Sequence, residues 1–159
     1  MSLDAPSKQP VRGAGLRFGI AAARFNEELV AALLARLETG LKEAGVKARD
    51  VAVVRVPGSH EVPWAAGRLA AARKFDCVIA LGVLIGGDTN HHEMVGQSVS
   101  HALQRVALDS GVPVINGVIV TDTLAQARVR CAGRINRGVE FAHAALAMAA
   151  LKRTLGGKS

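Results

Sequence analysis

The sequence predicts a single α/β domain in which a parallel sheet lies between two layers of helices. Segments with the pattern of buried strands, such as Cys77–Leu81, alternate with segments whose apolar residues recur at helical spacing, such as Leu29–Leu41. Strands that alternate with helices form βαβ units, which make the strands parallel and place helices on both faces. The 159 residues suffice for one domain with a substantial core.

Each strand is expected to lead into a helix. The four expected strands are residues 16–23, 50–56, 77–81 and 113–120. The expected helices run from the cap residue Asn26 to Gly45, from Ser59 or His60 to Ala72, from the cap types Asp88–Asn90 to Gly111, from the cap residues Thr121–Thr123 to about Arg130, and from Val139 to Lys152. We expect residues 1–14 to be a flexible tail, residues 15–154 to form the domain, and residues 155–159 to be a frayed end.

Composition favours a small anion as the partner and argues against nucleic acid and membrane. The net charge is +7 and the pI about 10.3, a balance that attracts anions. Aromatic residues make up only 3%, and the basic residues are scattered, which is unlike a nucleic-acid interface. We expect no membrane span and no signal peptide. Two cysteines make no disulfide framework, so we expect a cytoplasmic protein with reduced thiols.

Residues 82–95 carry the strongest functional signal. Gly86–Gly87 follows the third strand and allows a tight turn or a close approach to a ligand. Asp88–Asn90 offers three good N-cap types, and His91 and His92 stand at the start of the helix. A helix N-terminus suits a phosphate, and a histidine beside it can transfer protons near neutral pH.

Three kinds of site compete for this stretch. A nucleotide phosphate loop is disfavoured because Asp88 stands where the lysine is needed. A metal site would use His91–Glu93, but neighbours on a helix point about 100° apart, and Gly96 replaces the second histidine of H-E-x-x-H. Metal-free acid–base chemistry on a small phosphorylated substrate is the third kind. The plain structural alternative is a capped helix with two solvated histidines.

The rest of the chain favours the third kind, because ligands of such folds lie beyond the carboxyl ends of the strands. Candidate side chains fall near these ends, at Phe25–Asn26, Ser59–Glu61, residues 82–93 and Asn116. Each has a structural explanation when taken alone. Phe25 could be a core or staple residue, and Glu61 could be a carboxylate that the dipole favours at a helix start. Asn116 could simply provide a hydrogen bond to the backbone. Four loops together indicate a ligand site.

Five motifs, in register from about Leu16 to Arg153, resemble the lumazine synthase family. They are ARFN, VPGSHEVP, ALGVLIGGDTNHHEMV, GVPVINGVIVTDT and NRGVEFAHAALAM. The resemblance implies a three-layer α/β/α sandwich with a four-stranded parallel, flavodoxin-like sheet. It also implies a transferase that condenses 5-amino-6-ribitylaminouracil with 3,4-dihydroxy-2-butanone 4-phosphate, the penultimate step of riboflavin biosynthesis. The products are 6,7-dimethyl-8-ribityllumazine, phosphate and water.

The same resemblance implies roles for individual residues. The substrate amine itself forms the Schiff base, so neither a cofactor nor a metal is expected, and His91 would be the general acid–base. The pyrimidine and ribityl pocket would be formed by Phe25, Asn26, Ser59, His60, Glu61, Val83, Leu84, Ile85 and Asn116. The phosphate would be held by Gly87, Asp88, Thr89 and Arg130. His92 would form a wall, and Arg137 would add positive potential.

The chain also departs from the family pattern. Gly86 replaces a frequent arginine, Asp88 a small residue, His60 an apolar or aromatic residue, Asn116 a frequent phenylalanine, and His92 a frequent Phe or Tyr. The loop after Arg130 is about one residue short. These changes keep open an alternative, a catalytically drifted relative that binds a ligand or forms a shell.

The resemblance further implies a homo-oligomer. The family forms pentamers with active sites between neighbouring subunits, and some members form decamers or shells of sixty subunits. The high apolar content and the face formed by Val99, Leu103 and Val106 are compatible with assembly.

Overall fold

The computed structural model describes residues 7 and 9–156, and within them it has the predicted α/β architecture. A parallel sheet of four strands has the order β2–β1–β3–β4, which matches the flavodoxin-like arrangement. The strands are β1 (Phe18–Ala23), β2 (Val51–Val56), β3 (Cys77–Ile85) and β4 (Val114–Thr121). All three pairings are parallel, so the four carboxyl ends lie at one edge.

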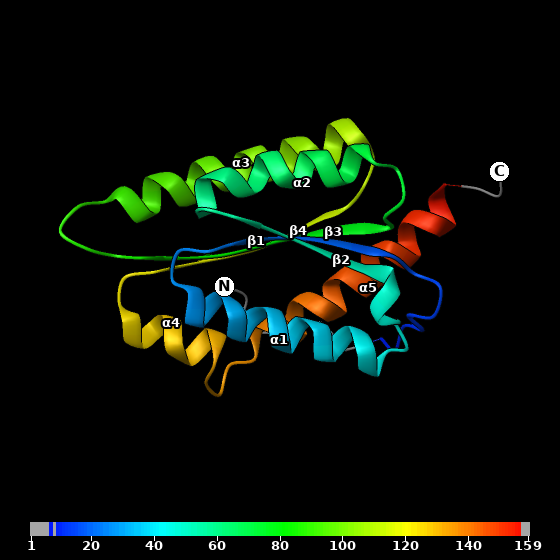
Figure 1. Ribbon diagram of the computed structural model, residues 1–159, viewed down its shortest axis with the longest axis horizontal. Helices are drawn as coiled ribbons and strands as arrows, with labels where there is room; N and C mark the ends of the chain where they lie inside the picture. Colours follow the sequence, from blue (N-terminus) through cyan, green and yellow to red (C-terminus); the bar gives the residue numbers. More distant parts are fainter. Residues whose placement is uncertain (1–6, 8, 157–159) are drawn as a thin grey trace.

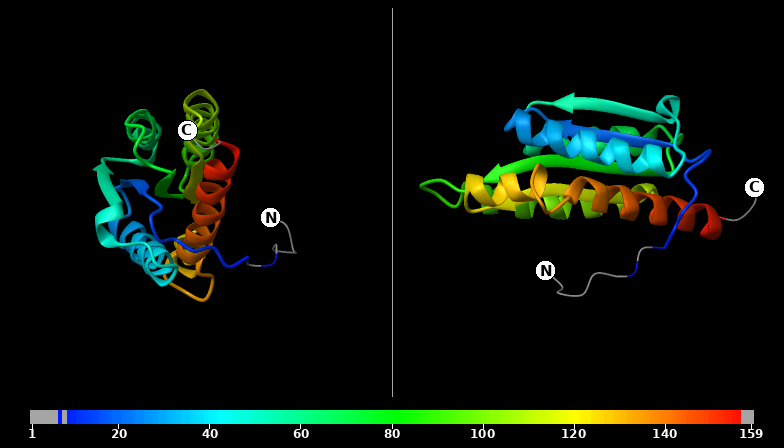
Figure 2. Two further views of the ribbon diagram at one scale, coloured as in Figure 1. Left: turned by 90° about the vertical axis from the view of Figure 1, so that its right-hand side faces the viewer. Right: turned by 90° about the horizontal axis from the view of Figure 1, so that it is seen from below.

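Helices cover both faces of the sheet, which completes the three layers (Figure 1). One face carries α2 (Val62–Ala71) and α3 (His91–Ser110). The other carries α1 (Glu27–Glu43), α4 (Leu124–Cys131) and α5 (Arg137–Leu155). Figure 2 shows α1 beside the α4–α5 pair on this second face. Two short 3₁₀ helices, Ala48–Asp50 and Ser59–Glu61, flank β2.

The central strands are apolar throughout because both of their faces are covered. All six residues of β1 are buried, as are the first seven of β3. Buried parallel strands show such continuous apolar runs in place of alternation. The stripe of α1 packs on one face through Leu29, Val30, Leu33, Leu37 and Leu41.

Strand β3 is longer than predicted, and this moves the start of the turn. The predicted end was Leu81, whereas the strand continues to Ile85. Its last four residues pair with β4, from Gly82 opposite Val118 to Ile85 opposite Thr121. Gly82 is thus a strand residue. A glycine is needed at this position because a Cβ there would collide with the Ser59 hydroxyl. The turn therefore begins at Gly86.

Helix starts follow the predicted cap residues only in part. Helix α2 begins at Val62, after the 3₁₀ turn Ser59–Glu61, and not at Ser59 or His60. Thr123 caps α4 as expected, since its hydroxyl accepts a hydrogen bond from the Gln126 N–H. Asn26 occupies the cap position of α1 in a left-handed conformation (φ 57°), but its side chain bonds to none of the described helix N–H groups. Helix α5 begins at Arg137, two residues earlier than predicted, because Asn136 caps it by accepting from Val139 N.

Parts of both ends of the described chain contact the domain. Val11 packs on the core, and Gly13 N–H donates to Ala44 O at 2.7 Å. Helix α5 continues to Leu155. The predicted tails fall partly on residues 1–6, 8 and 157–159, which lie outside the described residues. Within the described part of the chain, no helix is long and apolar enough to cross a membrane.

Candidate active site

A cavity of about 450 Å³ lies at the carboxyl edge of the sheet, where the predicted site residues were expected. It gathers side chains from the loops after β1, β2 and β3 and from the start of α3. The predicted residues that line it are Phe25, Asn26, Ser59, His60, Glu61, Val83, Leu84, Ile85, Gly87, Thr89, His91 and His92. The sequence analysis missed Gly58 and Val95, which also line it. Both have simple signals, a Pro-Gly turn and the first apolar position of a helical stripe.

Phe25 and Asn26 form the wall that follows β1. The Phe25 side chain is 73% exposed, so it is neither a core residue nor a buried staple. The Asn26 amide donates to Val83 O at 2.8 Å, which ties this wall to the end of β3. The exposed ring therefore stands on a fixed backbone at the rim of the cavity, available for a planar ligand.

The Ser59–Glu61 turn forms the wall that follows β2. Glu61 Oε2 accepts from the Gly58 N–H at 2.8 Å, and Oε1 lies 3.8 Å from His60 Nδ1. Ser59 is buried against Gly82, and its hydroxyl has no hydrogen-bond partner among the described residues. Glu61 thus stabilises the turn with one oxygen and leaves the other near the cavity.

The start of α3 provides backbone N–H groups and two imidazoles. Asn90 is the cap residue, and none of the described side chains caps this helix, so Asp88 does not cap it either. The first N–H groups of a helix have no partner within the helix and attract anions. His91 is exposed, and Gly87, Thr89 and His91 all line the cavity, while Asp88 is not part of the lining.

His92 contacts an acidic residue from another loop. Its side chain is 12% exposed, and Nε2 lies 3.6 Å from Asp122 Oδ1. Neither ring nitrogen has a hydrogen-bond partner in the described structure, and such an unpaired buried group costs about 1–3 kcal/mol. His92, Glu93 and Asp122 each place one potential metal-ligand atom within 4.8 Å of the others. Both carboxylates are exposed, an arrangement that is common without an ion.

Three predicted residues lie away from this cavity in the single chain. Asn116 lies on the edge strand β4, where it pairs with Ala80 of β3, and its Oδ1 accepts from Val118 N at 3.1 Å. Arg130 Nη1 donates to Gln126 O on α4 at 3.0 Å. Arg137 Nη1 donates to Glu140 Oε2 at the start of α5. None of the three is part of the cavity lining within the described chain.

The two thiols are unsuited to act as nucleophiles. Cys77 and Cys131 are both buried and form no disulfide in the described structure. Burial, together with the nearby Asp76 charge, raises the pKa of Cys77 to about 12. Burial raises the pKa of Cys131 to about 11. Only a thiolate is nucleophilic, so neither thiol is suited to nucleophilic catalysis near neutral pH.

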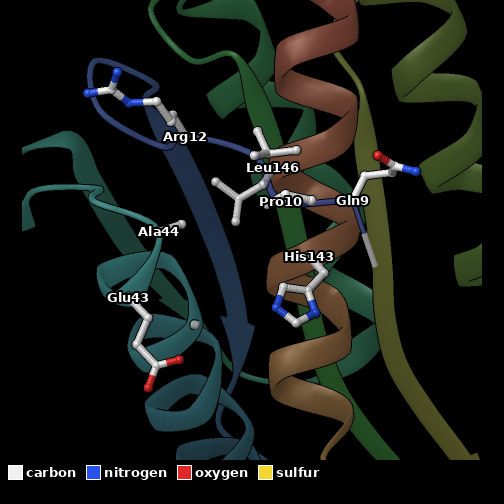
Figure 3. A pocket seen from close by; sticks show the side chains of 9 residues that line it. Gln9, Pro10, Arg12, Glu43, Ala44, His143 and Leu146 are labelled. Carbon is white, nitrogen blue, oxygen red and sulfur yellow. The ribbon is translucent and has the colours of Figure 1, made fainter. Parts of the chain in front are cut away.

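A larger cavity of about 650 Å³ lies on the face of the sheet that carries α1 and α5. It is bounded by residues 9–12, the last turns of α1 and the middle of α5, with Glu43 and His143 in its lining (Figure 3). None of the loops at the carboxyl edge contributes to this lining within the described chain. The smaller cavity is therefore the better candidate despite its size.

The family model for 6,7-dimethyl-8-ribityllumazine synthase matches residues 15–153. The chain belongs to this family. A relative named 6,7-dimethyl-8-ribityllumazine synthase, from Thermococcus gammatolerans, is 41% identical over 143 residues, which cover 90% of this chain and 92% of the relative.

Family membership confirms the reaction class predicted from the sequence. The chain is a transferase of riboflavin biosynthesis, in the family that forms 6,7-dimethyl-8-ribityllumazine. The family also implies small-molecule substrates and assembly into oligomers.

Proposed function

We propose that the cavity at the carboxyl edge is the active site for condensing 5-amino-6-ribitylaminouracil with 3,4-dihydroxy-2-butanone 4-phosphate. The observation that carries this proposal is the convergence of three loops around His91. An exposed ring, a carboxylate and a helix N-terminus lie around the exposed imidazole of His91. A planar substrate and a phosphorylated substrate need these groups together.

The pyrimidine would lie against Phe25. An exposed aromatic face on a fixed backbone offers a stacking surface for a planar ring, and the Asn26 hydrogen bond to Val83 O holds that backbone in place. The backbone of Val83–Ile85 would contact the edge of the pyrimidine. Ser59, His60 and Glu61 would bind the ribityl chain, with the free Glu61 oxygen accepting hydroxyl hydrogen bonds.

The phosphate would bind at the turn before α3. Gly87–Thr89 offers backbone N–H groups close to the positive end of the helix dipole. Asp88 would contribute its N–H while its exposed carboxylate stays in water. His91 would then lie near the carbon atoms next to the phosphate.

His91 would move the protons of each step. The pyrimidine amine attacks the ketone and releases water to form a Schiff base, and elimination then releases phosphate and leaves a new carbonyl after tautomerisation. The second amine attacks this carbonyl and closes the ring with loss of a second water. Each step transfers a proton, which suits an imidazole because it can both donate and accept one. The substrate amine forms the imine itself, so the proposed chemistry requires no cofactor.

A neighbouring subunit would complete the site. Asn116 and Arg130, which were predicted to contact substrate, and Arg137, which was predicted to add positive potential, lie outside the cavity lining of their own chain. In a ring with one repeated heterologous contact, these residues can reach the cavity of the next subunit. We propose a pentamer as the unit of assembly, which decamers or shells of sixty subunits would repeat. Arg130 would then clamp the phosphate as a planar, charged fork.

The buried, reduced thiols support a cytoplasmic location.

An absorbance assay tests the proposal. The purified protein is mixed with both substrates, and the lumazine chromophore is followed against the uncatalysed reaction. We expect clear acceleration, and a loss of about 10²–10⁴-fold in His91→Ala because the general acid–base is removed. His101→Ala, an exposed imidazole further along α3, is the matched control and should keep the wild-type rate.

Two results would contradict the proposal. No acceleration by a folded, assembled protein would favour a drifted relative that binds a ligand or forms a shell. Activity of His91→Ala within about twofold of wild type would remove His91 from the acid–base role.

A further inference from the structure

His92 and Asp122 come from different loops and meet beside the proposed phosphate site. His92 is the second residue of α3 and lines the cavity, whereas Asp122 lies in the turn between β4 and α4. Nε2 of the ring and Oδ1 of the carboxylate are 3.6 Å apart. This is just beyond hydrogen-bonding distance, so a small rotation of either side chain would close the bond.

The backbone of Asp122 is held in place from two sides. Its N–H donates to Gln126 Oε1 at 3.0 Å. On the other side it packs on Gly86, where a Cβ would lie 2.6 Å from the Asp122 carbonyl oxygen. The preceding residue is fixed as well, because Gly86 N donates to Thr121 O at 2.7 Å. Asp122 therefore offers its carboxylate to His92 from a rigid turn.

The two ring nitrogens are enclosed and without hydrogen-bond partners among the described residues. Buried polar atoms nearly always have a hydrogen-bond partner. Two ring nitrogens without one, at the edge of a cavity, therefore point to a missing partner. Asp122 can satisfy one nitrogen and nothing described satisfies the other. The terminal torsion of a histidine is broad, so the ring can turn when a partner arrives.

We propose that His92 is a substrate-binding residue and that Asp122 positions it. Asp122 accepts a hydrogen bond from Nε2–H, which leaves Nδ1 as the acceptor atom of the imidazole. Nδ1 then accepts a hydrogen bond from a hydroxyl of the phosphorylated substrate. This role of His92 and Asp122 rests on the proposed function, because it assigns a hydroxyl-binding group to the same cavity.

Steady-state kinetics with separate titration of each substrate tests the pair. In His92→Phe, which keeps a ring but loses both nitrogens, the KM for the butanone phosphate should rise about tenfold. The KM for the pyrimidine and the kcat should stay within about twofold, because the contact is lost equally from the ground state and the transition state. His92→Gln, which keeps a donor and an acceptor, should recover part of the loss. His101→Phe is the matched control on the same helix.

A double-mutant cycle isolates the role of Asp122. Asp122→Ala should raise the same KM severalfold in the wild-type background and leave it unchanged in the His92→Phe background. Asp122→Asn, which keeps an acceptor oxygen, should stay near wild type. Independent effects of the two changes would contradict the positioning role. A purely structural role would lower the thermal unfolding midpoint and kcat together and leave the butanone phosphate KM unchanged, which would overturn the proposal.

Calorimetric titration separates this inference from the proposed reaction. If the wild type forms no lumazine, the proposed function fails, but binding of the butanone phosphate still tests the pair. A tenfold weaker affinity in His92→Phe, with unchanged affinity for inorganic phosphate, supports a contact to the hydroxyl. Equal affinities, a matching loss for inorganic phosphate, or no binding to the wild type would overturn it.

Discussion

Gly86 is a residue at which two loops of the site pack tightly against each other. A Cβ there would lie 2.6 Å from the carbonyl oxygen of Asp122 and 3.0 Å from its Cα. These are backbone atoms, which cannot move aside as the end of a flexible side chain can. The small residue at this position therefore joins the turn after β3 to the turn after β4.

The adjacent glycine gives a matched comparison. Gly86→Ala should lower the free energy of unfolding by about 1–3 kcal/mol, because an added methyl group overpacks the contact with Asp122. Gly87→Ala should cost much less, since a Cβ at Gly87 would meet no described atom within 4 Å. Denaturant unfolding at equal protein concentration measures both. Equal losses in the two variants would contradict this account of the packing.

The parts of the site that depend on a single loop could be predicted from the sequence. Phe25, Glu61 and His91 each follow a strand, and parallel topology alone brings such positions to one edge. The contact of His92 with Asp122 could not be predicted, because it joins two loops separated along the chain. The bond from Asn26 to Val83 O is of the same kind, since an asparagine at a helix start normally indicates a cap.

At the scale of elements, one buried carboxylate joins three parts of the fold. Asp76 precedes β3 and accepts from Arg17 N at 2.7 Å and from Arg153 Nε and Nη2 at 2.8 and 2.9 Å. Arg153 also donates to Gly15 O at 2.8 Å. The hydrogen bond to Asp76 raises the pKa of Arg153. The end of α5 is thereby fixed to the start of β1 and of β3.

Removal of this carboxylate should destabilise the domain. Asp76→Ala leaves the Arg17 N–H and the guanidinium without their acceptor, so we expect a loss of about 2–3 kcal/mol. Asp109→Ala is the control, because its pair with Arg105 is exposed and spans one helical turn; such pairs contribute about 0.3–0.5 kcal/mol. Urea titrations of both variants and wild type give the comparison. A loss no greater than that of Asp109→Ala would show that the network is dispensable.

Element boundaries were harder to predict than element types. The order of strands and helices follows from apolar periodicity, which is a local property of the chain. The end of β3 depends on β4, because residues 82–85 are strand only through pairing with residues 118–121. Gly82 in isolation indicates a turn, and only the approach of Ser59 explains it within a strand.

At the scale of the whole molecule, the single chain exposes large apolar side chains and does not bring all the residues predicted for the site into one cavity. Trp64 on α2 and Leu108 on α3 are exposed, as is Leu155 at the end of α5. Exposed apolar side chains of this size are suited to contacts between copies. The residues predicted for phosphate binding are also divided, with Gly87 and Thr89 in the cavity and Arg130 on α4.

Subunit complementation tests the shared site most directly. His91→Ala and Arg130→Ala chains are co-expressed with different tags, and assemblies that contain both are purified and assayed at low butanone phosphate. If the two residues serve a site between neighbours, random mixing restores about one quarter of the sites, because each half is intact in half of the subunits. Assemblies of each variant alone should stay slow. No recovery above the two parents would mean that both residues act within one chain, and would contradict the shared site.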